Sequence, residues 1–453
     1  DTTYSYDALG RLVTSSSGGH TTTLSYSGAA NTLANDGTST YTHDPADALF
    51  AVGSATAGAQ TPLLAWTDQH DDVVGQFGAA ATSLTKSVSY DPWGSLTTGN
   101  TSGLITLDRV QVLNSPGTCI SIAAHQGSVA ASQVLVNGCA ASGSGIFADV
   151  TGGLKMTASH LNAATGEGLF LVAGEPVTLL NVSSHMNAGG GIVIQSRPDS
   201  APKVSLTAVS VTRNEGTGVQ IGTLGAVSVD RSVFANNSGM GLMVMNINPE
   251  APAPVNVFRS QWIRNSGGLM VQSAGRIVVD GIRSEFNQGS PAISLDNMPG
   301  TLPIQISNRL GANTLANNDG PSFIMSNSKV TITGVNVVRS QGFQITAPNS
   351  AVTVMRSSIT DSQSHPGLII ISGGATTLAD VRVNNNNSVG ASLVTAGAGG
   401  PMRILRSQFN GNSGPGVSIS TLGRTQISQV EASNNSALGM ELVNNALNPT
   451  GWW

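Results

Sequence analysis

The sequence contains few charged and few aromatic residues, which make up 10% and 4% of its 453 residues. It has no run of about 18 apolar residues, so it predicts no transmembrane helix and no insertion into a membrane. The net charge is −5, from 20 basic and 25 acidic residues. Binding to nucleic acid requires a basic surface, so this balance argues against a nucleic-acid partner.

Glycine is abundant instead, with 54 residues, and the composition changes near residue 100. All five tyrosines precede that point: Tyr4, Tyr6, Tyr26, Tyr41 and Tyr90. Such a change predicts a domain boundary. We expect an N-terminal region over residues 1–100, a second domain over 101–445 and a C-terminal tail or cap over 446–453. Because the chain starts inside a sequence motif, we also expect it to be a piece of a longer protein.

From Ile105 onward one pattern of apolar residues returns roughly every 20–28 residues. It consists of two short period-two stretches, apolar-x-apolar, separated by two residues, which predicts two strands joined at a corner. Clear copies are Ile105, Leu107, Val110, Val112; Val204, Leu206, Val209, Val211; Val255, Val257, Ser260, Trp262; Val330, Ile332, Val335, Val337; and Met402, Ile404, Ser407, Phe409. A third apolar-x-apolar stretch, such as Leu242 and Val244, follows in each copy. Each copy therefore predicts one coil of three strands.

An Asn column and pairs of glycines lie between the second and third stretches of each copy. The Asn positions are 114, 137, 162, 187, 214, 237, 265, 287, 318, 386, 412 and 435, with Ser340 and Ser362 in two copies. Asn tolerates left-handed backbone, and stacked Asn amides can bond to the copies above and below. The glycines, such as Gly216 and Gly218, are expected to supply backbone angles that other residues resist.

This column pattern resembles the right-handed parallel β-helix proteins of the pectate-lyase-like superfamily over about 340 residues. The resemblance implies an all-β fold, a single-stranded right-handed parallel β-helix of about 14 coils. No 3.6-residue period appears, which excludes a helical solenoid. An antiparallel sandwich stays possible but would favour two-residue hairpin turns. The region 308–328 fits the pattern poorly, and 245–253 and 296–303 are expected to be longer turns, which often carry binding sites in solenoids.

The only two cysteines, Cys119 and Cys139, belong to adjacent coils but to different columns of the repeat. A disulfide is one interpretation. Two small buried residues without a bond are the favoured one, because free cysteine packs as a small apolar side chain.

The first hundred residues contain the string Tyr4-Ser5-Tyr6-Asp7-Ala8-Leu9-Gly10-Arg11-Leu12. It is similar to the YD repeat of the Rhs family, Y-x-Y-D-x-x-G-R-L. The stretches at 65–75 and 90–94 resemble the Rhs core segment, and together they imply β-hairpins. Nothing after residue 100 resembles the toxin of that family. Asp71 and Asp72 are better interpreted as solvated residues than as a catalytic pair.

Glycoside hydrolysis requires clustered carboxylates, and a lyase would require bound calcium and an Arg or Lys base. Most of the acidic residues after residue 100 stand alone in their coil. The ordered N-x-D, D-D, G-H-G, R-x-K series of polygalacturonases is absent apart from Asn317-Asn318-Asp319. The four histidines of the repeat, at 125, 160, 185 and 365, lack metal-ligand spacing. We therefore expect no catalytic residues, no resident metal and no cofactor, with calcium only if the protein is a lyase.

The densest polar feature is the first corner of the coils. Its column comprises Arg109, Gln133, Asn181, Arg231, Arg259, Arg356, Asp380, Arg406 and Gln429. It is either a basic strip that binds an anionic sugar or a set of exposed residues that keep the protein soluble. The candidate binding residues are Arg231, Arg259, Trp262, Arg264, Asp280, Arg283 and Glu285. Trp262 falls in a core column, so packing is the favoured role for it.

Three functions are compatible with these features. The first is a non-catalytic segment of a large secreted or cell-surface bacterial protein that binds polysaccharide or a surface glycan in adhesion. The second is a polysaccharide lyase or hydrolase with a shallow groove near coils six to eight. The third is a structural subunit that associates end to end, because an uncapped β-helix exposes bare strand edges. Trp452 and Trp453 are expected either to cap that end or to pack on further sequence of a longer protein.

Overall fold

The computed structural model describes residues 2–28, 31–44, 48–55, 63–67, 73–78, 86–87, 103–140, 143–395 and 400–444. Asp71, Asp72, the Tyr90 stretch, Trp452 and Trp453 lie outside these residues. The chain forms two compact units, residues 1–106 with 120–128 and residues 107–119 with 129–453. In the described part, no helix is long and apolar enough to cross a membrane.

The N-terminal unit contains short antiparallel strands, as the hairpin prediction expected. One sheet has three strands, β1(Thr2–Tyr6), β2(Leu12–Ser17) and β3(His20–Thr23). The other has seven: β4(Ser25–Tyr26), β5(Leu33–Asn35), β6(Ser39–His43), β7(Leu49–Ser54), β8(Leu63–Thr67), β9(Val73–Gly78) and β10(Lys86–Ser87). Most of the described side chains are exposed or half-buried, so this unit has little core of its own.

The turn at Asp7 explains why the residues of the YD string are specific. The Asp7 carboxylate accepts hydrogen bonds from the backbone N–H of Leu9 (2.9 Å) and Arg11 (3.0 Å). It also forms an ion pair with the Arg11 guanidinium (2.7 Å), which lies over the Tyr26 ring. Gly10 has a left-handed φ of 76°. Asp, Gly and Arg are therefore each required by this one turn.

The hydrogen bonds that close the Asp7 turn recur between Asp44 and Ala48, where the sequence shows only a faint copy of the string. Asp44 N–H donates to the Ala48 carbonyl (2.9 Å), and Ala48 N–H donates to the Asp44 carboxylate (3.0 Å). The strand register shifts just before both turns, with Tyr6 opposite Leu12 and His43 opposite Leu49. The sequence analysis missed this copy because His43 replaces a tyrosine and no Gly-Arg pair follows.

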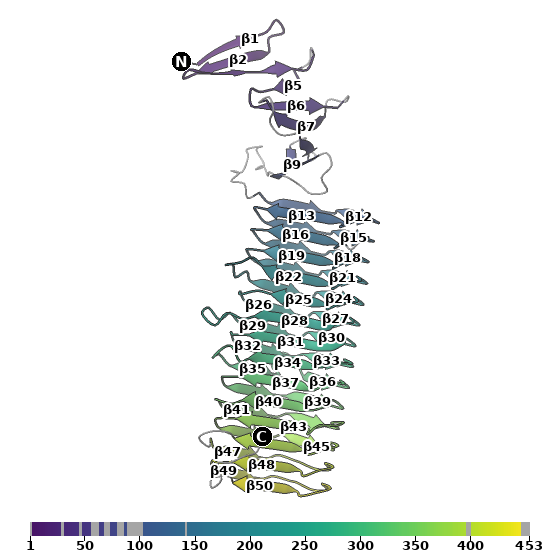
Figure 1. The fold of residues 1–453 in the computed structure, drawn as a ribbon, viewed down its shortest axis with the longest axis vertical. Helices are drawn as coiled ribbons and strands as arrows, with labels where there is room; N and C mark the ends of the chain where they lie inside the picture. The colour runs from purple at the N-terminus through teal and green to yellow at the C-terminus, as the bar shows by residue number, and fades with distance from the viewer. Residues whose placement is uncertain are drawn as a thin grey trace. The chain divides into compact units, whose positions relative to one another are not determined.

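The second part of the chain is a parallel β-helix, and its strands stack one above another in three sheets (Figure 1). We number the coils one to fourteen in chain order. The first sheet consists of β11(Ile105–Asp108), β14(Val129–Ser132), β17(Leu154–Thr157), β20(Val177–Leu180), β23(Val204–Thr207), β26(Val227–Asp230), β29(Val255–Phe258), β32(Ile277–Asp280), β35(Ile304–Ser307), β38(Val330–Thr333), β41(Val352–Met355), β44(Thr376–Ala379), β47(Met402–Leu405) and β49(Thr425–Ser428).

The second and third sheets complete each coil. The second consists of β12(Gln111–Leu113), β15(Leu135–Asn137), β18(His160–Asn162), β21(Ser183–His185), β24(Ser210–Thr212), β27(Val233–Ala235), β30(Gln261–Ile263), β33(Arg283–Glu285), β36(Asn313–Ala316), β39(Val335–Val338), β42(Ser358–Thr360) and β45(Arg382–Asn384). The third consists of β13(Ile120–His125), β16(Ile146–Val150), β19(Leu169–Ala173), β22(Ile192–Ser196), β25(Val219–Gly222), β28(Met240–Asn246), β31(Gly267–Ser273), β34(Ile293–Asn297), β37(Ser322–Ser326), β40(Phe343–Ala347), β43(Leu368–Ser372), β46(Ala391–Thr395), β48(Val417–Thr421) and β50(Met440–Asn444). The expected fold of about fourteen parallel coils is confirmed.

Alternation along each strand fills the interior with aliphatic side chains. In β26 and β29 the inward residues Val227, Val229, Val255 and Val257 are fully buried, whereas their neighbours are half-buried. Equivalent residues pair directly between coils, for example Val229 with Val257. Because each buried column repeats through the coils, β-branched residues pack on identical neighbours, which suits a parallel sheet.

The expected ladder of asparagines is present, and it begins at Asn187. Asn187, Asn214, Asn237, Asn265 and Asn287 are buried, and each donates its side-chain amide to the Oδ1 of the next one at 2.8–3.2 Å. Each Oδ1 also accepts the backbone N–H of the preceding Asn, at 3.0–3.1 Å. Neighbouring coils are thus joined by side chains as well as by the backbone.

Three members of the predicted Asn column are wrong. Asn114 occupies the left-handed position that precedes the ladder, and Asn137 and Asn162 are the last residues of β15 and β18. In the ladder itself the left-handed residue is the one before each Asn, such as Arg264 (φ 54°) before Asn265. The asparagines are therefore present for their amides and not for their backbone freedom.

Glycine is required beside the ladder for a different reason from the expected one. Gly218 and Gly416 do not have a left-handed φ. A Cβ on Gly218 would lie 2.5 Å from the Gly241 carbonyl oxygen and 2.8 Å from the Asn237 Nδ2. Glycine is required here because the backbone passes directly over the buried amide.

The prediction that the two cysteines are unbonded is wrong, because Cys119 and Cys139 form a disulfide with their Cα atoms 5.5 Å apart. Gly138 takes the left-handed position, so Cys139 stands in the second coil where later coils place the ladder Asn. The turn after Asn114 brings Cys119 of the first coil beside it. The two cysteines belong to different columns of the repeat, but the turn after Asn114 carries the chain from one column to the other and so brings them together.

The region 308–328 is a regular coil with one enlarged corner. Five residues, 308–312, separate β35 from β36, and Ser322–Ser326 forms β37 in register with its neighbours. The poor fit to the sequence pattern came from the longer corner. The expected long turns are confirmed between β28 and β29 and between β34 and β35.

Candidate functional site

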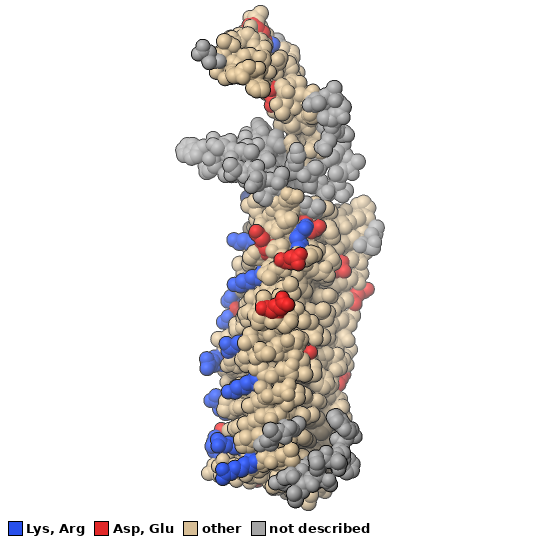
Figure 2. Space-filling model, turned by 60° about the vertical axis from the view of Figure 1, so that its left-hand side comes forward, with Lys and Arg blue, Asp and Glu red and all other residues tan. Residues whose placement is uncertain are grey.

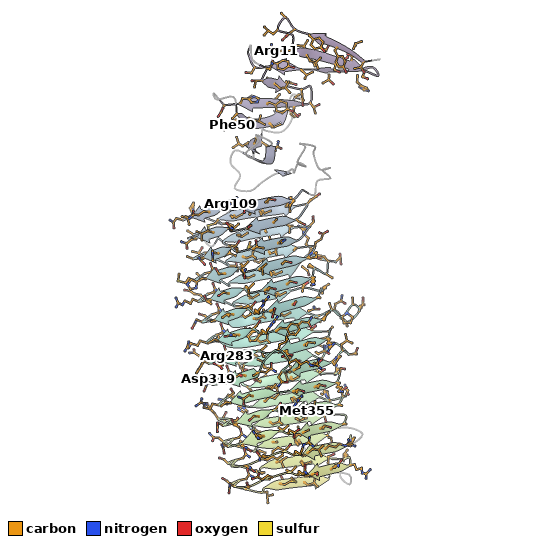
Figure 3. All side chains as sticks on the ribbon, turned by 180° about the vertical axis from the view of Figure 1, so that it is seen from behind. Arg11, Phe50, Arg109, Arg283, Asp319 and Met355 are labelled. Atoms are coloured by element: carbon orange, nitrogen blue, oxygen red, sulfur yellow. A yellow bond between two sulfur atoms is a disulfide. The ribbon has the colours of Figure 1, made fainter. Side chains whose placement is uncertain are left out.

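The predicted corner column lies between the first and second sheets and has one backbone conformation. Its members have φ between 44° and 56°: Arg109, Gln133, Asn181, Arg231, Arg259, Arg356, Asp380, Arg406 and Gln429. Left-handed backbone turns the chain while the side chain points outward, so the column is exposed. Figure 3 labels Arg109, the first member of this column, at the upper end of the β-helix. Figure 2 shows basic side chains one above another along one edge of the β-helix.

Arg231 and Arg259 lie on adjacent coils, as expected, but both are bound to a carboxylate. Arg259 donates two hydrogen bonds to Asp230, at 2.8 and 2.6 Å, and Arg231 donates one at 3.2 Å. The hydrogen bonds that Arg259 donates to Asp230 raise the pKa of Arg259. Asp230 is mostly buried and contacts both arginines, so its negative charge neutralises part of the positive charge of the corner column. Sequence reasoning missed Asp230 because it is the last residue of a strand, one position before the column.

Trp262 lies in the core and does not reach the surface. Its side chain is fully buried and stacks on Phe234, with ring centroids 5.8 Å apart and planes 13° apart. The packing role favoured by the sequence is therefore confirmed, and its inclusion among the surface binding residues is wrong. A core column of Val and Phe accepts Trp because the larger ring fills the same interior stack.

The remaining candidates do not come together as one site. Arg264 stands at the second corner, over the Phe286 ring at 5.5 Å. Arg283 forms an ion pair with Glu285 at 2.6 Å, which raises the pKa of Arg283. Asp280 is buried at the first corner. Each of these side chains contacts a neighbouring residue of the same or an adjacent coil. They therefore make separate structural contacts and do not form one binding site.

A groove of about 750 Å³ lies along the first corner, over coils nine to fourteen and not over coils six to eight. Its lining consists of two parallel columns of polar residues. The corner column contributes Arg356, Asp380, Arg406 and Gln429, and the column two residues later contributes Asn336, Ser358, Arg382, Gln408 and Glu431. The first column was predicted from the sequence and the second was not. The residues of the second column could have been recognised because they take the outward position at the start of the following strand.

The groove is closed at its upper end by the enlarged corner of the ninth coil. Asn308 and Ala312 line it there. The buried Asp280 carboxylate fixes this loop, because it accepts hydrogen bonds from Ser307 Oγ (2.6 Å) and from the N–H groups of Arg309 (3.2 Å) and Leu310 (2.9 Å). Asp280 thus positions a wall of the groove without lining it.

The two carboxylates of the groove are both engaged. Asp380 accepts two hydrogen bonds from Arg406, at 2.7 and 3.0 Å, and this contact lowers the pKa of Asp380, with Arg356 adding a smaller electrostatic effect. Glu431 accepts hydrogen bonds from Gln408 (3.2 Å) and Ser433 (3.0 Å).

Two cations of the groove remain open to a ligand. Among the described residues, neither the Arg356 nor the Arg382 guanidinium has a hydrogen-bonding or ion-pairing partner. Both side chains are exposed. A guanidinium presents a planar fork of donors that matches a carboxylate or sulfate. The groove therefore offers two arginine side chains to an anion.

A metal site is not formed by the described side chains, in which no three His, Cys, Asp or Glu residues gather. The histidines at 160, 185 and 365 instead bond to neighbouring Ser, Thr and Gln side chains.

The family model named "Right handed beta helix region" matches residues 96–251, 194–359 and 322–450, so the chain belongs to this family. No curated protein matches the chain.

Three solved structures are similar at low scores. The Azotobacter vinelandii mannuronan C-5 epimerase AlgE4 A-module is 14% identical, covers 76% of this chain and 89% of its own, and has a TM-score of 0.31. The catalytic domain of a GH87 alpha-1,3-glucanase in complex with tetrasaccharides is 10% identical, with 77% and 63% covered and a TM-score of 0.33. The AlgE6 A-module of A. vinelandii is 15% identical, with 76% and 91% covered and a TM-score of 0.26. These scores are too low to transfer a function.

Proposed function

We propose that the β-helix is a non-catalytic module of a secreted or cell-surface protein and binds an anionic polysaccharide in the groove over coils nine to fourteen. The observation that carries the proposal is the pair of guanidinium groups of Arg356 and Arg382, on neighbouring coils of one polar groove, which form no hydrogen bond or ion pair with the described residues. Arginine recognises carboxylates and sulfates through paired hydrogen bonds.

The shape of the groove favours an extended polymer over a small ligand. Its lining repeats from coil to coil at the strand spacing of about 4.8 Å, so equivalent donors recur along one line. Asn336, Ser358, Gln408 and Gln429 add uncharged donors and acceptors between the arginines. Such side chains suit the hydroxyl groups of sugars, and the charged pairs suit their acid groups.

The state of the carboxylates favours binding over catalysis. A general acid for glycoside hydrolysis requires a raised pKa, so that it is protonated near neutral pH. The Arg406 hydrogen bonds lower the pKa of Asp380 instead. Asp380 therefore contributes a fixed negative charge that orients Arg406.

Binding of the whole chain to a polyuronate and to a neutral glucan of matched length, measured by calorimetry, tests the proposal. Replacing Arg356 and Arg382 together by Gln should weaken polyuronate binding by about tenfold or more. Gln occupies both columns in other coils, at Gln429 and Gln408, so the fold should tolerate it. The matched control is Arg213→Gln with Arg339→Gln, two exposed left-handed residues at the second corner.

Three results would overturn the proposal. One is equal affinity for the neutral glucan, and another is an equal loss of affinity in the control variant. The third is release of unsaturated or shortened products from the polyuronate, with or without calcium, which would favour the lyase or hydrolase alternative.

A further inference from the structure

The outer face of the third sheet carries two columns that contain many apolar side chains. Pairing between coils places the outward residues of β16 to β48 one above another. The apolar members are Phe147, Phe170, Val193, Met243, Met270, Phe323 and Ile369 in one column, and Val172, Met245, Met325, Ile371 and Val394 in the other. Figure 1 looks onto this sheet, across the middle of the view.

The first sheet shows what an ordinary solvent-facing column of this β-helix looks like. Its first outward column is almost all polar: Ala130, Lys155, Thr178, Ser205, Ser228, Asn256, Val278, Gln305, Thr331, Thr353, Thr377, Arg403 and Gln426. Its second outward column, next to the corner, also contains Leu180, Phe258, Met355 and Leu405. The same coils therefore place more large apolar side chains outward on the third sheet than on the first. The third sheet thus differs from the first in a way that the repeat itself does not require.

The side chains of this face pack on one another but remain accessible. The Phe147 and Phe170 rings are stacked with centroids 5.7 Å apart. Met245 is 42% exposed, and Phe170, Met270 and Phe323 are half-buried. Polar residues and one glycine interrupt both columns at coils five, eight and ten, namely Gln220, Gly222, Ser294, Asp296, Gln344 and Thr346. The apolar side chains therefore form accessible clusters along the face, and exposed apolar clusters indicate an interaction surface.

The face also lacks charge that a partner would have to match. From β16 to β48 the two columns contain no Lys or Arg and only two acidic residues, Asp149 and Asp296. Asp149 forms an ion pair with Arg197, whose Nε also donates to the Val150 carbonyl (2.9 Å). Asp296 accepts hydrogen bonds from Gln272 (3.3 Å) and from the Met298 N–H (2.8 Å).

We propose that a second copy of this chain covers this face, so that two β-helices pack side by side through their third sheets. Both carboxylates of the face already accept hydrogen bonds from this chain, so the face presents mainly uncharged side chains to an identical face, as a two-fold interface requires. The face is twelve strands wide, at a spacing of about 4.8 Å, and about four residues long in the strand direction. Its area is therefore roughly 700 Å² per copy, close to the roughly 800 Å² per partner of a standard stable interface.

The dimer would go beyond glycan binding, because the groove at the first corner lies on other sheets and stays open. Two grooves on one particle would engage the same polymer together. That arrangement raises the effective affinity through linkage of the two binding events and without new contacts to the ligand.

Sedimentation equilibrium of the whole chain tests the proposal, and the expected mass is twice the chain mass of 46.0 kDa. Met243→Lys with Met270→Lys places two cations at the centre of the face, on coils six and seven, and should raise the dimer dissociation constant by about a hundredfold or more. The matched control, Ser228→Lys with Asn256→Lys, adds the same charges to the outward column of the first sheet on the same two coils. Its dissociation constant should stay within about threefold of the original.

Circular dichroism and thermal unfolding verify that both variants fold. If the Met pair fails to fold with Lys, Met243→Ser with Met270→Ser removes apolar area without charge and should also weaken the dimer. A single 46.0 kDa species at all concentrations would overturn the proposal. So would equal weakening by the control pair, a mass that keeps growing with concentration, or a monomer that floats with phosphatidylcholine vesicles.

Discussion

The side-chain amide of Asn237 donates a hydrogen bond to the Oδ1 of Asn265, one coil further along, at 2.9 Å. The same oxygen accepts the backbone N–H of Asn237 at 3.1 Å. Asn265 in turn donates to Asn287 and to the carbonyl of Phe234. One buried amide thus binds the coils before and after it.

Replacing Asn265 by Ala should lower the free energy of unfolding by about 2–4 kcal/mol, because buried donors and acceptors on both sides lose their partner. Denaturant unfolding and hydrogen exchange at coils six to eight would measure the loss. Asn256→Ala, a half-buried residue facing outward from the same coil, is the control and should change stability by less than about 0.5 kcal/mol. Equal effects of the two changes would contradict a structural role for the ladder.

The Cys119–Cys139 disulfide closes a loop with a sequence separation of 20 residues. Replacing both cysteines by Ser should destabilise the first coils by about 3 kcal/mol through the entropy of the opened loop. Since coils of a solenoid contact only their neighbours, hydrogen exchange should rise in coils one to three and not in the ladder. Dithiothreitol should reproduce this change in the original chain and have no effect on the variant. Uniform destabilisation of all coils would contradict the prediction.

Trp262 is a core residue, and among the described atoms its indole Nε1 has no hydrogen-bond partner. Trp262→Ala should cost about 3–5 kcal/mol by leaving a cavity beside Phe234. Trp262→Phe should cost much less, about 1.5 kcal/mol or below, because it keeps the stack and removes an unpaired buried N–H. Thermal and denaturant unfolding would separate the two. Polyuronate affinity of the folded Phe variant should be unchanged, and a loss would restore Trp262 as a binding residue.

Asp380 provides a pH test of the groove. Hydrogen bonds from Arg406 lower its pKa from the usual 3.8, so the ion pair persists above that pH and is lost as the pH falls through the lowered value. The small stability that the pair contributes should disappear in the same direction. Protonation frees Arg406, so affinity for a sulfated polymer, which stays charged in acid, should rise as the pH falls through this lowered pKa.

Asp380→Asn is the matched variant, because it frees Arg406 at every pH. Its affinity for the sulfated polymer should exceed that of the original chain near neutral pH and should not change in acid. Titration calorimetry at several pH values would show the two curves converging at low pH. An original chain whose affinity falls in acid would contradict the assigned role of Asp380.

The period-two apolar pattern was sufficient to predict the coils, because inward residues such as Val229 and Val257 repeat in register. The corner column was predictable for the same reason, as residues between two strands must turn outward. The side-chain partners were not. Asp230 precedes Arg231 directly in the sequence, but it becomes a neighbour of Arg259, 29 residues away, only through the stacking of two coils. Spacing along one coil does not contain that information.

The ladder register and the disulfide failed for a related reason. Alignment by residue type placed Asn137 in the Asn column, whereas the backbone places Cys139 there, because the left-handed Gly138 comes between them. A polar residue type alone does not fix which side of a corner it occupies. The second column of the groove, with Arg382 and Glu431, was hidden because one polar strand residue resembles any other until its neighbours are known.

The ladder is the same in every coil from Asn187 to Asn318, because each side-chain amide requires only one acceptor oxygen at a fixed position in the next coil. A coil could therefore be duplicated or deleted as a whole, and the neighbours on either side would meet across the junction with their registers intact. The length of the β-helix can therefore change by whole coils. Each added or removed coil would lengthen or shorten its surface by one strand spacing.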